Sequence, residues 1–146
     1  MPDLVVIDTN VLQKANAPLN QRARPDSKFA RRLHLLQRLQ QRRLTALISR
    51  RLLAEYRQQV PEPRNDFVRA FFELLTNGGA TANYCRWTGQ RRNDARHCRF
   101  PREHYHVLRT AICDARSTIL TEEDRMLATD ACIHRRLRVH VQDPTA

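Results

Sequence analysis

Glycine is scarce in this chain, with three residues among 146, and none of them follows the first apolar run, residues 4–7. A dinucleotide-binding Rossmann fold needs a glycine-rich turn there to cradle a pyrophosphate, so that class fits poorly. Long hydrophobic runs are also missing, because no apolar stretch approaches the roughly 20 residues of a membrane-spanning helix. No basic residue precedes the first apolar run, so we expect no signal peptide and a cytoplasmic protein that makes no membrane contact.

Closely spaced cysteine pairs are absent as well, since the four cysteines contain no C-x-x-C motif. We expect Cys113 and Cys132, which lie on apolar helix faces, to be buried thiols. The residues with zinc-binding chemistry are Cys85, Cys98, His97, His104 and His106. Their spacing matches no common structural zinc site, so we expect no zinc.

Lysine is nearly absent, because only Lys14 and Lys28 among the 26 basic residues are lysines. Arginine binds phosphate groups through two parallel hydrogen bonds and stacks on bases. A GC-rich coding bias would explain the arginine-to-lysine ratio but not the formal net charge of +11. This charge predicts a polyanionic partner such as RNA, or else an acidic protein.

Strand-like and helix-like patterns alternate along the chain. Apolar residues recur at helical spacing in residues 29–39, 52–60, 67–75 and 126–133, whereas residues 4–7, 45–48, 117–120 and 138–141 read as short strands. This alternation is typical of βαβ units around a parallel sheet. With 41% hydrophobic residues, the chain is long enough for one domain that spans residues 1–146.

Residues 78–102 form the least regular part of the sequence, and this segment is basic. Its arginines alternate with Tyr84, Trp87 and Phe100, a mixture that suits a single-stranded nucleic acid stacked on aromatic rings. An ordinary surface loop anchored by its aromatic residues explains the pattern equally well. If the segment binds RNA, the residues that we expect to contact it are Arg86, Trp87, Arg91 and Arg92.

Two acidic residues follow predicted strands. Asp8 comes directly after an apolar run rich in β-branched residues, at the sheet edge where α/β proteins place their ligands. Asp8 is also a suitable N-cap for the next helix. Glu55 lies in the helix that follows the next strand, for which Ser49 is a natural N-cap, and it either leans toward the same edge or pairs with a nearby arginine.

Further acids occur near the end of the chain. Glu103 starts a predicted helix, and Glu122, Glu123 and Asp124 follow the strand that ends at Leu120. The last three have a structural interpretation, in which Thr121 caps a helix whose first turn carries acids that complement its dipole.

The segments VVIDTNVL, LISRRLLAEY and HVLRTA followed by STILTEED resemble the ordered acidic motifs of PIN-domain ribonucleases. Within that superfamily the chain most resembles the bacterial toxin-like branch, which includes the VapC toxins. The resemblance runs from residue 5 to about residue 144 and includes the closing RVHVQDP segment. It implies a three-layer α/β/α fold with a central, mainly parallel sheet, and metal-dependent cleavage of RNA.

The resemblance also assigns roles to individual residues. Asp8 matches the first acid, Asn10 its supporting polar residue, and Glu55 the second acid. The third acid falls on His104 with Glu103 beside it, so either Glu103 serves through a shift of one residue or the acid has been lost. The last motif is usually T-x-D. Here Thr121 is followed by Glu123 at the expected offset and by Asp124 just beyond, and either acid would serve.

The ion that such carboxylates would bind is Mg²⁺ or Mn²⁺, because both prefer oxygen ligands. The resemblance further implies a homodimer and an antitoxin protein that covers the basic face or the acidic site. An alternative is a catalytically impaired PIN-like domain that binds RNA or a protein. Phosphotransfer domains built around Asp8 fit poorly, because the chain lacks the acidic pair, the late lysine or the second aspartate that those classes require.

Overall fold

A five-stranded parallel sheet forms the centre of the computed structural model, which describes residues 3–19, 24–78, 80–82, 86–114 and 116–146. Its strands are β1 (Asp3–Ile7), β2 (Leu44–Ile48), β3 (Ala80–Ala82), β4 (Thr118–Leu120) and β5 (His140–Gln142). Their order is β3-β2-β1-β4-β5, and every neighbouring pair is parallel. The central strand is therefore β1, with β2 and then β3 on one side of it and β4 and then β5 on the other.

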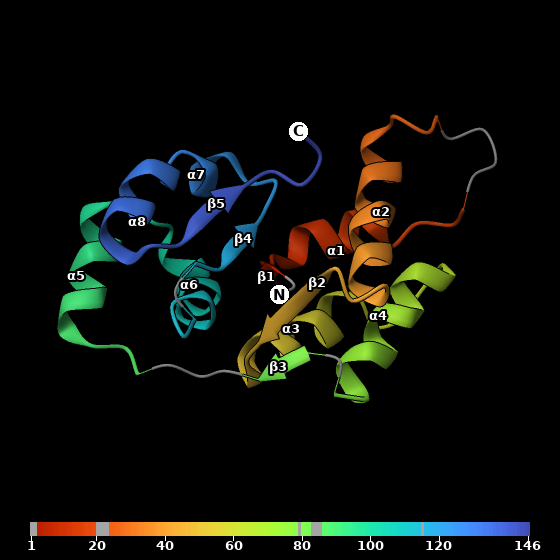
Figure 1. The fold of residues 1–146 in the computed structure, drawn as a ribbon, viewed down its shortest axis with the longest axis horizontal. Helices are drawn as coiled ribbons and strands as arrows, with labels where there is room; N and C mark the ends of the chain where they lie inside the picture. Colours follow the sequence, from red (N-terminus) through yellow and green to blue (C-terminus); the bar gives the residue numbers. More distant parts are fainter. Residues whose placement is uncertain (1–2, 20–23, 79, 83–85, 115) are drawn as a thin grey trace.

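Helices cover both faces of the sheet and give the three-layer α/β/α architecture expected from the sequence (Figure 1). In Figure 1, α1, α2 and α4 lie on one side of the strands, and α5, α6 and α8 lie on the other. α6 packs on β1, β2 and β4, and α8 packs on β5. The helices are α1 (Thr9–Ala15), α2 (Lys28–Gln40), α3 (Arg50–Gln59), α4 (Asp66–Thr76), α5 (Gly89–His97), α6 (Tyr105–Ala111), α7 (Asp124–Leu127) and α8 (Asp130–Leu137), with a 3₁₀ turn, η1 (Arg102–His104), before α6.

Four of the helices begin at side chains that satisfy a free backbone N–H group. Ser27, Ser49, Asn65 and Thr88 precede α2, α3, α4 and α5, and each accepts a hydrogen bond from the N–H group three residues ahead. A cap of this kind contributes about 1 kcal/mol to helix stability. The prediction that Ser49 caps its helix is confirmed.

The apolar strand residues are buried, as expected for strands covered on both faces. Val6 and Ile7 of β1 and Leu47 of β2 are fully inaccessible to solvent. The last predicted strand is shorter than expected, because Arg138 ends α8 in a left-handed conformation with φ at 64°. The helix predicted at residues 126–133 is two helices, α7 and α8, separated by Ala128 and Thr129.

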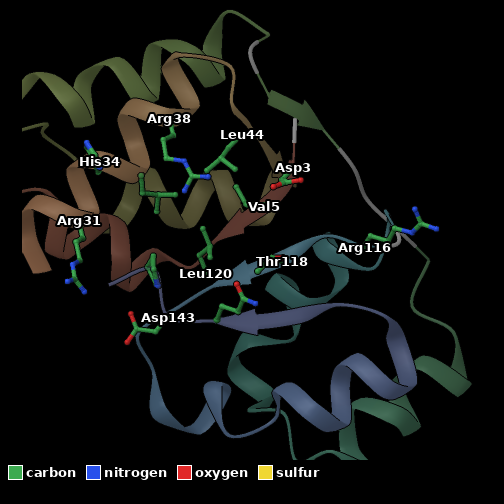
Figure 2. Close-up of a pocket in the computed structure, with 13 residues that line it drawn as sticks. Asp3, Val5, Arg31, His34, Arg38, Leu44, Arg116, Thr118, Leu120 and Asp143 are labelled. Carbon is green, nitrogen blue, oxygen red and sulfur yellow. The ribbon is translucent and has the colours of Figure 1, made fainter. Parts of the chain in front are cut away.

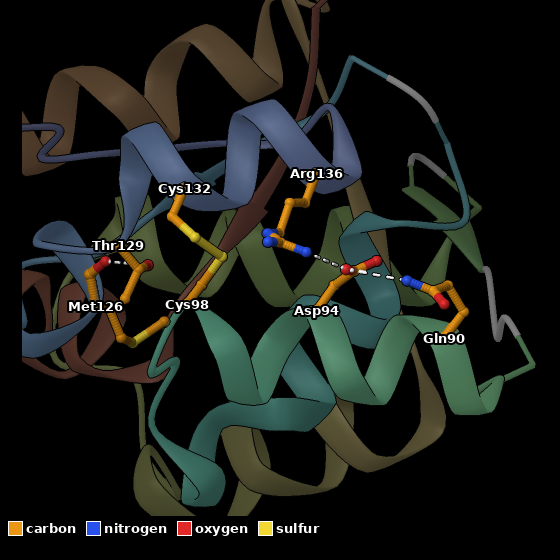
Figure 3. Close-up of a disulfide and its surroundings, with 7 residues drawn as sticks. All are labelled: Gln90, Asp94, Cys98, Met126, Thr129, Cys132 and Arg136. Atoms are coloured by element: carbon orange, nitrogen blue, oxygen red, sulfur yellow. Dashed lines mark hydrogen bonds and ion pairs between the residues drawn. A yellow bond between two sulfur atoms is a disulfide. The ribbon is translucent and has the colours of Figure 1, made fainter.

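The predictions for residues 78–102 and for the cysteines need correction. The segment 78–102 is not irregular throughout, because it contains β3 and the nine-residue helix α5. Cys132 is not a free thiol, because it forms a disulfide with Cys98 that joins α5 to α8 (Figure 3). Cys113 is only half-buried, and Cys85 lies outside the described residues. Among the helices described, none has the length and apolar character that crossing a membrane requires.

Candidate metal centre

The ends of β1 and β4 bring the predicted acids together. Asp8 directly follows β1 and Thr121 directly follows β4, and the Asp8 N–H donates a 2.9 Å hydrogen bond to the Leu120 carbonyl. The strand order also reverses between β1 and β4, because β2 and β3 lie on one side of β1 whereas β4 and β5 lie on the other. Open α/β sheets bind their ligands at this point, outside the carboxyl ends of the strands.

Asp8 is buried and held in one orientation. Its side chain is 1% exposed. One carboxylate oxygen accepts from the Thr9 N–H at 3.0 Å, and the other accepts from the Thr121 hydroxyl at 2.8 Å. Burial raises the pKa of Asp8 more than these hydrogen bonds lower it. The ionised carboxylate is therefore poorly solvated, and a cation beside it would be stabilising. Asp8 also serves as the N-cap of α1, so both interpretations of this residue are compatible.

Three side chains converge on one point: Asp8, His104 of η1, and Glu123, which precedes α7. Each offers one ligand atom, and these atoms all lie within 4.8 Å of one another. The His104 Nε2 contacts the Glu123 carboxylate, and its Nδ1 lies 3.9 Å from Asp8 Oδ1 without a hydrogen-bond partner. Glu123 is positioned by its own N–H, which donates to the Thr121 hydroxyl at 3.1 Å.

Glu55 lies beside this cluster, and its negative charge contributes to the raised pKa of Asp8. It accepts a hydrogen bond from the Thr9 hydroxyl, and its other oxygen lies 2.5 Å from His106 Nε2. The contact with His106 lowers the pKa of Glu55, so this carboxylate is ionised at neutral pH. Tyr56, the next residue, donates to the Ile7 carbonyl and so ties α3 to the end of β1.

The remaining predicted acids point elsewhere. Glu103 is exposed and pairs with Arg125, and its own backbone N–H together with Arg125 lowers its pKa. Asp124 is exposed in the first turn of α7 and is not part of the three-residue cluster. Glu122 is drawn away by Arg32, whose nitrogens approach its carboxylate at 2.6 and 2.8 Å. Glu123 is thus the acid of this segment that reaches Asp8 and His104.

The two supporting polar residues have different surroundings. Thr121 does not cap α7, which begins at Asp124 without a side-chain cap; its hydroxyl instead links Asp8 to the Glu123 backbone. Asn10 lies in the first turn of α1, and its side-chain oxygen is buried without a hydrogen-bond partner. A buried oxygen that lacks a donor is suited to a cation or a water molecule nearby.

The sequence interpretation did not assign His104 or His106 to the site. The spacing of the third motif did fall on His104, but carboxylate chemistry directed the assignment to its neighbour Glu103. No pattern in the sequence indicated that His106 contacts Glu55, because that contact depends on how α6 packs against α3.

Of the predicted RNA-contacting residues, Trp87 belongs to a small cluster next to η1. The Trp87 ring lies 5.5 Å from that of Tyr105, the residue after His104, and the Arg109 guanidinium lies 5.8 Å from the Trp87 ring. Arg91 donates to the Arg86 carbonyl at 3.0 Å. Arg86 and Arg92 are exposed. Trp87 therefore anchors its segment to α6, as in the surface-loop interpretation, while Arg86 and Arg92 face solvent.

A cavity of about 480 Å³ lies away from the acids, on the sheet face next to α2 (Figure 2). Val5 and Leu120 line it from the sheet, and Leu44 and Arg38 line it beside α2. Asp8, His104 and Glu123 are not among its lining residues. The metal-binding geometry is therefore at the sheet edge and not in this cavity.

The fold and the cluster together define a class: an α/β protein with two carboxylates and a histidine at the switch point of a parallel sheet. No model of a known protein family matches the chain, and no curated protein or solved structure does.

Proposed function

We propose that this protein is a metal-dependent endoribonuclease. The observation that carries the proposal is the convergence of Asp8, His104 and Glu123, with the ionised Glu55 beside them, at the switch point of the sheet. Hydrolysis of phosphodiester bonds commonly uses such ligand sets at one or two metal ions. The net charge of +11 supports a polyanionic substrate, and the resemblance of the ordered motifs to PIN-domain ribonucleases supports RNA.

Asp8, His104 and Glu123 would hold the ion. The Asp8 carboxylate fits this role because it is buried and poorly solvated when ionised. His104 Nδ1 fits it because that nitrogen has no hydrogen-bond partner. Mg²⁺ takes almost exclusively oxygen ligands, whereas an imidazole also suits softer divalent ions. We therefore propose that Mn²⁺ supports activity better than Mg²⁺. When bound, the ion would activate a water molecule and stabilise charge on the phosphoryl oxygens.

The chain's own residues would orient and charge the site. Thr9 and Thr121 fix the two oxygens of Asp8, so its lone pairs are directed before an ion arrives. His106 and the Thr9 hydroxyl hold Glu55 ionised, where it adds negative charge for a second cation. Exposed arginines such as Arg86 and Arg92 would contact the RNA backbone.

We also propose a biological role, which rests on the sequence resemblance alone. The protein would be the cytoplasmic toxin of a toxin–antitoxin pair, active as a homodimer and neutralised by an antitoxin. An acidic antitoxin segment would be attracted to the basic surface.

A second candidate function is RNA binding without efficient cleavage. The observation that favours it is His104, a neutral or cationic ligand at the position where the resemblance expects an acid. Fewer negative charges would weaken the binding of a second metal ion.

Cleavage of a mixed RNA pool by purified protein with Mn²⁺, with Mg²⁺ or with EDTA tests the proposal. We expect metal-dependent cleavage that Asp8→Asn reduces at least a hundredfold, because one ligand charge is lost at nearly constant volume. Glu103→Gln is the matched control, since it removes an exposed carboxylate outside the cluster and should retain activity within about twofold. Full activity of Asp8→Asn would refute the assignment. RNA binding without cleavage by the unmodified protein would favour the second candidate.

A further inference from the structure

A second hollow, of about 400 Å³, lies at the opposite end of the strands from the metal centre. The described residues that line it are all basic: Arg116, His134, Arg138 and His140. Arg116 precedes β4 by two residues and Arg138 precedes β5 by two residues. Because Thr118 and His140 are register partners in these adjacent parallel strands, the two arginines lie at corresponding positions just before the strands begin. His134 reaches the same place from the last turn of α8.

Positive charge in this hollow is only partly compensated. In the part of the chain that the structure describes, neither Arg116 nor Arg138 forms an ion pair. The nearby carboxylate is Asp130, whose oxygen lies 3.4 Å from His140 Nδ1 and also accepts the Val141 N–H at 2.8 Å. Asp130 thus contacts His140 but is not among the described residues that line the hollow.

The two histidines are arranged face to face. Their ring centroids lie 3.7 Å apart and their planes differ by 16°. This stacking places both imidazoles at the same hollow, where one anion could contact both. The Asp130 carboxylate lies on the Nδ1 side of the His140 ring but forms no hydrogen bond with that nitrogen.

We propose that this hollow binds a phosphate group, carried either by a free nucleotide or by RNA. Guanidinium groups match the geometry of phosphate oxygens, and imidazolium N–H groups add charge-assisted hydrogen bonds. The volume is within the range of small-molecule sites and leaves room for a sugar beyond the phosphate. Arg116 lies between this hollow and the cavity beside α2, because it lines both (Figure 2). This site needs no metal ion and does not depend on the proposed nuclease activity.

Inorganic pyrophosphate is the first probe, titrated into the protein in EDTA while the imidazole resonances of His134 and His140 are followed by NMR. We expect saturable shifts of both resonances. Arg116→Gln/Arg138→Gln should weaken binding at least tenfold, because it removes both guanidinium groups. Arg57→Gln is the matched control, since it removes one exposed positive charge from α3 and should change affinity less than twofold. His140→Gln is a second variant that keeps both arginines, and it should also weaken binding several-fold.

Three further ligands distinguish the sources of the phosphate: AMP, a short RNA with a 5′-phosphate, and the same RNA with a 5′-hydroxyl. Tighter binding of AMP than of either RNA would assign a nucleotide site, and preference for the phosphorylated RNA would assign an RNA end. Equal, saturable binding of both RNAs that the double variant abolishes would assign a backbone phosphate. Absence of saturation, or an equal loss in Arg57→Gln and the double variant, would overturn the proposal.

Discussion

At the scale of single residues, His104 separates what the sequence predicted from what it did not. Asp8, Glu55 and Glu123 were predictable because each lies just after a recognisable strand or in the helix that follows one. The sequence could not decide between Glu103 and His104, because the choice depends on which of the two side chains points toward Asp8. Successive residues of a 3₁₀ turn point about 120° apart, so only one of the two can face Asp8. The turn presents His104 to the cluster and Glu103 to Arg125.

Replacing this histidine should change the metal preference. We expect His104→Asp to raise cleavage with Mg²⁺ relative to Mn²⁺ at least fivefold, because an oxygen ligand replaces a nitrogen ligand. Rates in each metal, together with Mn²⁺ affinity from electron paramagnetic resonance, measure the change. His97→Asp is a control that alters an exposed histidine outside the cluster. An unchanged metal ratio in His104→Asp would show that His104 does not bind the ion.

Asp8 provides a test of stability without metal. Its raised pKa means that folding disfavours the ionised form, so this residue destabilises the protein as pH rises above 3.8, the ordinary carboxyl value, and continues to do so at pH 7. In EDTA at pH 7, we expect Asp8→Asn to raise the melting temperature by a few degrees, where ~1 kcal/mol corresponds to about 2–8 °C. Added Mn²⁺ should stabilise only the unmodified protein. A lower melting temperature of Asp8→Asn in EDTA would contradict this account, and Asp124→Asn, exposed in α7, should be neutral.

At the scale of elements, helices were predictable where they pack a broad apolar face against the core. α4 buries Val68, Phe71 and Leu75 at helical spacing. α5 buries only Asp94 and Ala95, so its sequence has no apolar period to detect. α5 is instead fixed by the Thr88 cap, by an Asp94–Arg136 ion pair at 2.9 Å and by the disulfide to α8 (Figure 3).

The disulfide should contribute measurably to stability. Its cysteines are 34 residues apart, and closing a loop of that length stabilises a protein by about 3–4 kcal/mol. We expect Cys98→Ala/Cys132→Ala to lower the melting temperature by 10 °C or more and to make the protein insensitive to dithiothreitol. Cys113→Ala is the control, because it removes a cysteine that is not part of this disulfide. Equal melting temperatures of the unmodified protein with and without reductant would show that the disulfide does not form in solution.

At the scale of the whole molecule, the class of fold was predictable and the strand order was not. Buried β-branched runs that alternate with helices indicated a parallel sheet. β3, β4 and β5 have three residues each, too few to carry a pattern that specifies their neighbours. Long-range packing therefore decides which strand lies beside β1, and with it which acids meet.

The net charge predicts how RNA binding responds to salt. With Asp8→Asn to prevent cleavage, four phosphate contacts on single-stranded RNA would weaken affinity roughly 50-fold between about 50 and 200 mM salt. Fluorescence anisotropy measures this slope. An affinity that does not change with salt would contradict a binding mode dominated by arginine–phosphate contacts.

The place of β1 between β2 and β4 also sets when the site can form during synthesis. Asp8 is made before its hydrogen-bond partner Thr121, which follows 113 residues later. At about 5–20 residues per second, the ribosome needs roughly 6–23 s to cover that interval. Until β4 is made, β1 lacks one of its two neighbours, and Glu123 does not yet exist. The site of the nuclease that we propose therefore cannot assemble until Thr121 and Glu123 have been synthesised.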